Sequence, residues 1–360
     1  MGLSRGDRIA RLALLALAVA SLAAGVAGGL ARLGVASAGA AAADHGALMI
    51  AGFLATVIGL ERAVALGPRI ALAVPLASGC GALLLLLGEP SCARALFVFA
   101  ALGLVAASAA IARRQPQSHT LLLAAAAVAL LNGNALYAAA APAATVIPWW
   151  FAFLVVTIAA ERLEMTRLLA RPRWAEGVLL AITVFILCAA AATLVEPVSA
   201  AVAYGAGLVA LAAWLTIFDL ARRTIRTQGF ARFAATALLA GYAWLAVAGF
   251  AWISSATIEP RARDLALHAL GLGFVFSMIL AHAPVIVPAV ARVPMGYAPF
   301  LYVPLVALHG SLALRVIGGF AQAELRRLGG VLNAVTLALF VVSIAATIFA
   351  ARRRPGRPAG

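Results

Sequence analysis

The stretch ALHALGLGFVFSMILAHA, residues 266–283, contains no Asp, Glu, Lys or Arg. An apolar run of this length predicts a helix that crosses a membrane. Similar runs recur along the whole chain, which is 65% hydrophobic and 11% charged and has a mean hydropathy of +1.07. A water-soluble core cannot bury that much apolar surface. The sequence therefore predicts an all-α fold, a polytopic transmembrane helix bundle in contact with the lipid bilayer.

About twelve runs are long enough to cross a bilayer, at about 20 residues each. These runs and their short turns use up the 360 residues, so we expect a single integral membrane domain over 1–360 and no soluble catalytic domain. The connections carry Gly, Pro and Arg, which end helices or lie at the interface. The expected spans are 9–30, 43–66, 69–87, 94–112, 119–141, 145–165, 174–192, 197–218, 230–254, 263–287, 297–318 and 328–351.

The net charge of +15 reflects 27 arginines in short segments around the apolar runs. That distribution is typical of membrane topology and not of a nucleic-acid-binding surface. If the N-terminus is cytoplasmic, 20 arginines fall in inner segments and 7 in outer ones. This bias predicts a multi-pass protein of a bacterial-type inner (plasma) membrane with both termini in the cytoplasm. The first run is longer than the apolar core of a signal peptide, so we expect an uncleaved helix.

A weak internal repeat relates three of the expected spans. FLATVIGLER at 53–62 recurs as FLVVTIAAER at 153–162, and FVFSMILAHA at 274–283 keeps the leading Phe and the Ile. Offsets of 100 and 121 residues connect the three segments. The repeat predicts three pseudo-repeated four-helix units, although chance similarity between Ala- and Leu-rich helices is the alternative.

The acidic side chains lie at helix ends or in loops, which argues against a pump or a proton-coupled transporter. Glu61 beside Arg62, and Glu161 beside Arg162, end the second and sixth spans on the inner side. We expect each neighbouring pair to form a structural ion pair.

Histidine distributes differently, because a neutral imidazole tolerates an apolar interior and binds haem iron or copper. His45 begins the second span and His268 lies about 7 Å into the tenth, so both are expected in the outer leaflet. Two imidazoles at one depth suit the axial positions of a haem. We therefore predict haem b bound by His45 and His268, with structural roles for both as the alternative. Small residues near both would leave room for the macrocycle, or would only allow close helix packing.

The other three histidines are less informative. His309 in the eleventh span could line the same cavity or serve as an additional metal ligand, and copper is possible there. His282 lies about 21 Å below His268 and cannot share its metal, although it too could serve a second metal. His119 begins the fifth span at the inner face, where we expect an interfacial role.

Arginines expected on the outer side are scarce. Arg326 and Arg327 are adjacent in the expected connection between the last two spans. A guanidinium fork suits carboxylates, so we predict contact of this pair with haem propionates. Contact with lipid phosphates is the alternative.

These features resemble the haem-bearing subunit I of haem-copper oxidases. The resemblance rests on twelve expected helices, on DHGALMIAGF at 44–53, on LHALGLGFVFSMI at 267–279 and on the adjacent arginines. It implies low-spin haem ligation and propionate binding by His45, His268, Arg326 and Arg327. The sixth to eighth spans contain no histidine, so the copper centre of that family, and oxygen or nitric oxide reduction there, are not expected.

The chain is also similar to the NnrS family, twelve-helix membrane proteins that contain haem and copper and are associated with the response to nitric oxide. The histidine-rich opening of their second helix is reduced here to His45. We therefore expect a haem-binding membrane protein that acts in electron transfer or in the response to nitric oxide, with a redox partner or nitric oxide as possible partners. No catalytic residue is evident.

Two other classes of function stay open. A small-solute transporter or channel without a cofactor would use discontinuous helices, and PVIVPAVARVP at 284–294 is a candidate break. A structural or assembly subunit would use the histidines only for packing.

Overall fold

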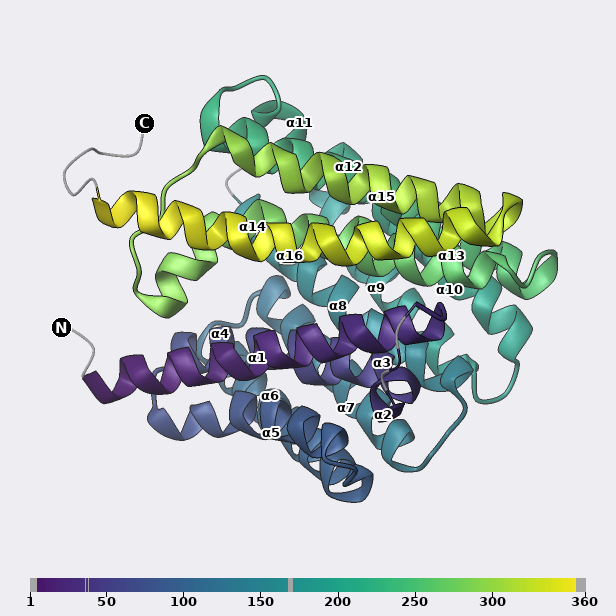
Figure 1. The fold of residues 1–360 in the computed structure, drawn as a ribbon, viewed down its shortest axis with the longest axis horizontal. Helices are drawn as coiled ribbons and strands as arrows, with labels where there is room; N and C mark the ends of the chain where they lie inside the picture. The colour runs from purple at the N-terminus through teal and green to yellow at the C-terminus, as the bar shows by residue number, and fades with distance from the viewer. Residues whose placement is uncertain (1–4, 36, 38, 168–170, 354–360) are drawn as a thin grey trace. The chain divides into compact units, whose positions relative to one another are not determined.

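The computed structural model describes residues 5–35, 37, 39–167 and 171–353, and these contain helices and no strand. Within these described residues, twelve helices are long and apolar enough to cross a membrane. Contacts divide the chain into two compact units, Met1–Ala160 and Glu161–Gly360. The elements, coloured along the chain in Figure 1, are α1 Arg5–Arg32, α2 Gly39–Ala43, α3 His45–Ala47, η1 Leu48–Leu54, α4 Ala55–Leu66, η2 Arg69–Leu72, α5 Ala73–Leu86, α6 Pro90–Arg114, α7 Ser118–Ala138, α8 Ala143–Met165, α9 Arg173–Ala192, α10 Pro197–Phe218, α11 Ala221–Thr224, α12 Gly229–Thr257, α13 Ala262–His268, η3 Ala269–Phe276, α14 Ser277–Ala291, η4 Pro299–Leu301, α15 Tyr302–Ala321 and α16 Ala323–Arg353.

Large apolar side chains remain exposed along the flanks of the long helices. Phe99 and Leu102 on α6 are 57% and 51% exposed, and Val184 and Phe185 on α9 are 59% and 47% exposed. Such surfaces favour lipid over water. The chain is therefore a multi-pass membrane protein whose apolar flanks contact the bilayer, which confirms the predicted fold class.

Local sequence explains where several spans begin and end. Pro90 and Pro197 occupy the first positions of α6 and α10, where a missing N–H costs no helical hydrogen bond. Gly67 ends α4 with a φ of +101°, a conformation that glycine adopts readily. The predicted last span begins too late, because α16 starts at Ala323 and includes Arg326 and Arg327. Their placement in a connection was wrong: Glu324 in the first turn favours the helix start, and two arginines are compatible with a helix at the membrane boundary.

In the unit Met1–Ala160, α1 packs against η1, α4 and α5, and the helices α5, α6 and α7 pack in chain order. Buried polar groups join its later helices. Asn134 donates from Nδ2 to the Phe97 carbonyl at 2.8 Å and accepts at Oδ1 from Trp150 Nε1 at 2.9 Å. The apolar surroundings make these bonds costly to lose, so they fix how α6, α7 and α8 pack.

In the unit Glu161–Gly360, α12 packs against α10, α13, η3 and α14, and α15 packs against α16. Glycine allows the closest approaches. A Cβ on Gly205 of α10 would lie 2.6 Å from the Gly249 carbonyl oxygen of α12, and the reverse holds for Gly249. Backbones this close are typical of membrane helix pairs, which pack through small residues.

Two membrane-crossing helices contain a π-helical segment that the sequence did not indicate. These segments, η1 and η3, widen the helix because each N–H bonds five residues back. The repeat offsets carry Leu48, where η1 begins, to Ala269, where η3 begins. They also carry Leu48 to Pro148, which lies inside α8. The relation between the second and tenth spans therefore has a structural counterpart, whereas the compact units number two and not three.

Gly273 in η3 is a test of this packing. A Cβ there would lie 2.5 Å from Cγ of Trp244 on α12, whereas a Cβ on Gly319 of α15 would meet no atom within 4 Å. We expect Gly273→Ala to lower the free energy of unfolding by about 1–3 kcal/mol through overpacking. Gly319→Ala should raise it by about 0.5–1 kcal/mol, because alanine favours helix. Denaturant unfolding of both variants in detergent checks this, and equal midpoints would contradict it.

Candidate functional site

His45 begins α3 and contacts α1 within the unit Met1–Ala160. Its Nδ1 lies 2.6 Å from the carbonyl oxygen of Gly25. A carbonyl only accepts hydrogen bonds, so Nδ1 donates and the neutral ring carries its lone pair on Nε2. Gly29 of α1 lies against the ring, because a Cβ there would be 3.0 Å from Cε1. The glycines of α1 therefore leave space for this imidazole and accept its hydrogen.

A polar cluster surrounds Asp44, the residue before His45. Tyr137 of α7 donates its hydroxyl to Oδ1 of Asp44 at 2.6 Å. The Arg94 guanidinium lies 5.0 Å from the centre of the Tyr137 ring, and the Trp150 ring centroid lies 5.3 Å from it. These contacts position the start of α3. Sequence reasoning missed the cluster, although all four residues lie at ends of spans expected on the outer side.

His268 ends α13 in the unit Glu161–Gly360. Its Nδ1 lies 2.8 Å from the carbonyl oxygen of Asp264, one turn earlier, and 3.3 Å from the Asp264 Oδ1. Arg315 of α15 donates to the same carboxylate, from Nη2 to Oδ1 at 2.9 Å and from Nε to Oδ2 at 3.1 Å. Arg315 is 8% exposed. Asp264 thus connects the imidazole to a buried guanidinium, a link that the spacing of four residues between Asp264 and His268 could have suggested.

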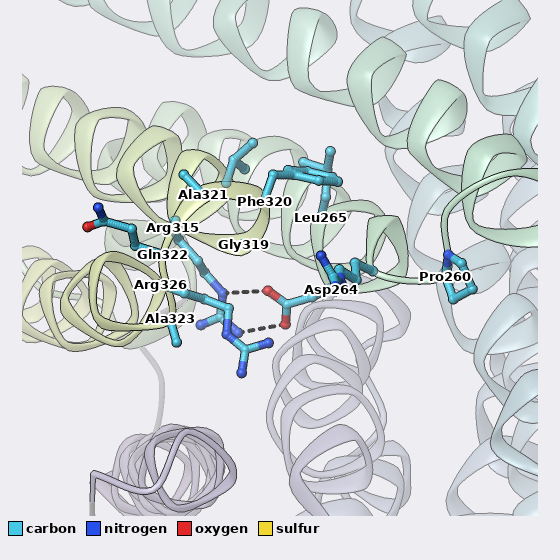
Figure 2. A pocket seen from close by; sticks show the side chains of 13 residues that line it. Pro260, Asp264, Leu265, Arg315, Gly319, Phe320, Ala321, Gln322, Ala323 and Arg326 are labelled. Carbon is cyan, nitrogen blue, oxygen red and sulfur yellow. Dashed lines mark hydrogen bonds and ion pairs between the residues drawn. The ribbon is translucent and has the colours of Figure 1, made fainter.

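A pocket of about 500 Å³ opens beside this ion pair. Figure 2 shows the Asp264 carboxylate bonded to Arg315, with the guanidinium of Arg326 close by. Arg261 also lines the pocket, which therefore has three cations against one carboxylate. Apolar walls include Leu265, Val316 and Phe320. Such a pocket suits an anionic oxygen group attached to an apolar body.

Arg326 and Arg327, the two arginines predicted to contact haem propionates, have different surroundings in the structure. Arg326 lines the pocket and lies within electrostatic range of Asp264. Arg327 donates from Nη1 to Glu324 Oε1 at 3.3 Å in an exposed pair, and it is not one of the lining residues. Arg315 has the more central position, because it lines the pocket and donates to both carboxylate oxygens of Asp264.

His309 of α15 contacts Trp244 of α12. The indole Nε1 donates to His309 Nδ1 at 2.9 Å, so the neutral ring carries its hydrogen on Nε2. That Nε2 is buried and has no hydrogen-bond partner. His309 does not line the pocket. Nowhere in the described chain are three or more His, Cys, Asp or Glu side chains grouped to hold a metal ion, so the possible copper has no such cluster there.

His45 and His268 share one local arrangement. Each precedes a π-helical segment, with two residues between in the first case and none in the second, and each directs Nδ1 to a backbone carbonyl. Histidines that ligate metals usually donate their other ring N–H to a carbonyl or carboxylate, which orients the ring and raises its basicity. The two rings lie in different units, so their pairing stays a prediction.

The family described as "Domain of unknown function (DUF8744)" matches residues 11–349. The chain belongs to the DUF8744 family. The match includes His45, His268, the pocket and all twelve candidate spans in whole or large part, so the DUF8744 region is the membrane domain itself. No curated protein matches the chain.

Proposed function

We propose that this DUF8744 protein binds haem b through the imidazoles of His45 and His268 and acts in electron transfer or in the response to nitric oxide. The observation that supports this most is the pair of Nδ1 hydrogen bonds to the carbonyls of Gly25 and Asp264. In both neutral rings, Nε2 is then the atom that can ligate iron.

The side chains assigned to the cofactor suit haem b. Neutral imidazoles are common axial ligands of haem iron, and bis-imidazole ligation supplies a one-electron couple without an open coordination position. The carboxylate side chains of the macrocycle need cations, and the pocket beside His268 offers Arg315 and Arg326. We propose that Arg326 and Arg327, which are adjacent in α16, contact the propionates. Of the two, Arg326 lines the pocket.

Electron transfer is the better supported of the two roles, because both ligand positions are assigned to imidazoles. A response to nitric oxide would require one of the imidazoles to leave. The likeness to the NnrS family is the reason for keeping this role, and a redox protein or nitric oxide is then the partner. We place the protein in a bacterial-type inner membrane with both termini in the cytoplasm, on the arginine bias.

A transporter or channel for a small solute is the second candidate. It is favoured by the interrupted helices, since η1 and η3 interrupt two spans and Pro284 and Pro288 lie inside α14. Transporters bind substrates where membrane helices depart from regular α geometry.

A reduced-minus-oxidised absorption spectrum of the purified protein, with iron and copper analysis of the same sample, separates the two candidates. Haem binding predicts a sharp reduced α band of a b-type cytochrome and about one iron per chain. A featureless spectrum from protein produced with ample haem would refute the haem proposal and leave the transporter and the structural or assembly subunit.

A further inference from the structure

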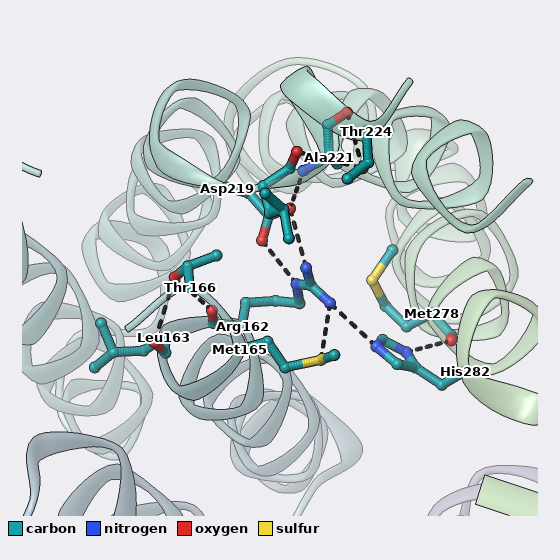
Figure 3. Close-up of polar contacts among 10 residues, drawn as sticks. Arg162, Leu163, Met165, Thr166, Asp219, Ala221, Thr224, Met278 and His282 are labelled. Atoms are coloured by element: carbon teal, nitrogen blue, oxygen red, sulfur yellow. Dashed lines mark hydrogen bonds and ion pairs between the residues drawn. The ribbon is translucent and has the colours of Figure 1, made fainter. Parts of the chain in front are cut away.

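A network of polar side chains, Arg162, Asp219 and His282, joins three helical segments of the unit Glu161–Gly360. Arg162, near the end of α8, donates from Nε to Oδ2 of Asp219 at 2.7 Å and from Nη2 to Oδ1 at 3.1 Å. The two side chains are 4% and 0% exposed. Nη1 of Arg162 lies 3.1 Å from Nε2 of His282 on α14. Figure 3 shows the guanidinium between the carboxylate that follows α10 and the imidazole.

The contacts of His282 define its protonation state. A guanidinium only donates hydrogen bonds, so Nε2 must accept from Arg162. Nδ1 lies 2.7 Å from the carbonyl oxygen of Met278, so it must donate. Both contacts therefore require the neutral ring with its hydrogen on Nδ1.

Protonation of His282 cannot be accommodated in this arrangement. A proton on Nε2 would put an N–H against the Arg162 N–H and bring two cations within hydrogen-bond distance. Arg162 cannot easily move away, since two bonds hold it to Asp219, which also accepts from the Ala221 backbone N–H at 2.7 Å. Movement of His282 together with α14 would separate the two cations.

The segment of α14 after His282 contains two prolines. Pro284 and Pro288 lie inside this helix and donate no backbone hydrogen bonds, so the last two turns are weakly tied to the turns before them. The helix ends at Ala291 and is followed by Arg292, which has a left-handed φ of +52°.

Other charged and titratable groups lie around this network of side chains. Glu161 and Arg171 act electrostatically on Arg162 and Asp219 respectively. Tyr242 on α12 is buried and interacts electrostatically with both Asp219 and Arg162. Of the other elements packed against α14, η3 has no charged residue, and α16 carries Arg352 and Arg353 in its last turn.

We propose that His282 is a proton-operated latch, which holds the proline-containing end of α14 on the Arg162–Asp219 pair when neutral and releases it when protonated. The proton binds the released state in preference, so falling pH favours release. The latch does not depend on haem binding.

Hydrogen–deuterium exchange of the full chain in detergent tests the latch at about pH 8 and about pH 5.5, on either side of the ordinary imidazole pKa of about 6.5. His282→Gln is the main variant, because an amide can accept from Arg162 and donate to Met278 without titrating. His119→Gln is the matched control. Comparison at equal pH cancels the intrinsic pH dependence of exchange.

At about pH 8 we expect the amides of α14 after His282 to exchange equally in wild type and His282→Gln. At about pH 5.5 they should exchange faster in wild type and in His119→Gln than in His282→Gln, by up to roughly tenfold, the most that one imidazole with an ordinary pKa in the released state can produce. Equal exchange at the lower pH would overturn the latch. If His282→Gln fails to fold, the wild type alone tests the latch. Protection of the α14 amides after His282, relative to protection of the α6 amides, should then fall from about pH 8 to about pH 5.5. Unchanged relative protection would overturn the latch.

Discussion

His268→Ala and His45→Ala should each reduce bound haem from about one per chain to less than about a tenth in the purified protein. Alanine removes an axial nitrogen together with its hydrogen bond to Asp264 or Gly25. A six-coordinate haem that loses one of two imidazoles loses both affinity and its low-spin spectrum. The reduced α band and the iron content per chain measure the loss.

His119→Ala and His309→Ala are the controls for this experiment. His119 lies in the first turn of α7, and His309 accepts from Trp244 and does not line the pocket. Both variants should keep full haem content. Full haem content in the His45 and His268 variants as well would remove the assignment of these ligands.

Arg162→Met should lower the free energy of unfolding by about 3–5 kcal/mol, because it leaves the Asp219 carboxylate buried without its cation. The carboxylate is fully enclosed and would keep only its bond to the Ala221 N–H among the contacts described above. Denaturant unfolding in mixed micelles measures the change, with far-UV circular dichroism as the signal.

The double variant Arg162→Met with Asp219→Asn is the matched control. It removes both charges and keeps an oxygen that can accept from the Ala221 N–H. Most of the lost stability should return, since a neutral pair has no uncompensated charge. A double variant as unstable as Arg162→Met would show that size and packing matter at this position, and not the buried charge.

The spans were largely predictable because the bilayer imposes its own length requirement, whatever the tertiary packing. The prediction for 197–218 coincides with α10, Pro197–Phe218. The last span was placed too late because Arg326 and Arg327 suggested a connection, whereas helix ends at the interface accept arginines.

The partner of Arg162 was not predictable. The sequence suggested Glu161, but neighbouring residues on a helix point about 100° apart and do not face each other. The structure shows that Asp219, which is remote in sequence, binds Arg162 bidentately. By contrast, Asp264 and His268 are four residues apart on one helix, and their contact could have been inferred.

Amino-acid order alone accounts for the membrane class, the twelve spans and the choice of histidines as candidate ligands, because hydropathy, span length and the scarcity of ionisable groups are local properties of the chain. Tertiary structure decided which groups meet. The π-helical segments, the bonds of His45 and His268 to carbonyls, the pocket around Arg315 and the contact of Arg162 with His282 all depend on how helices pack. Packing joins residues far apart in sequence, and no spacing along the chain encodes such contacts.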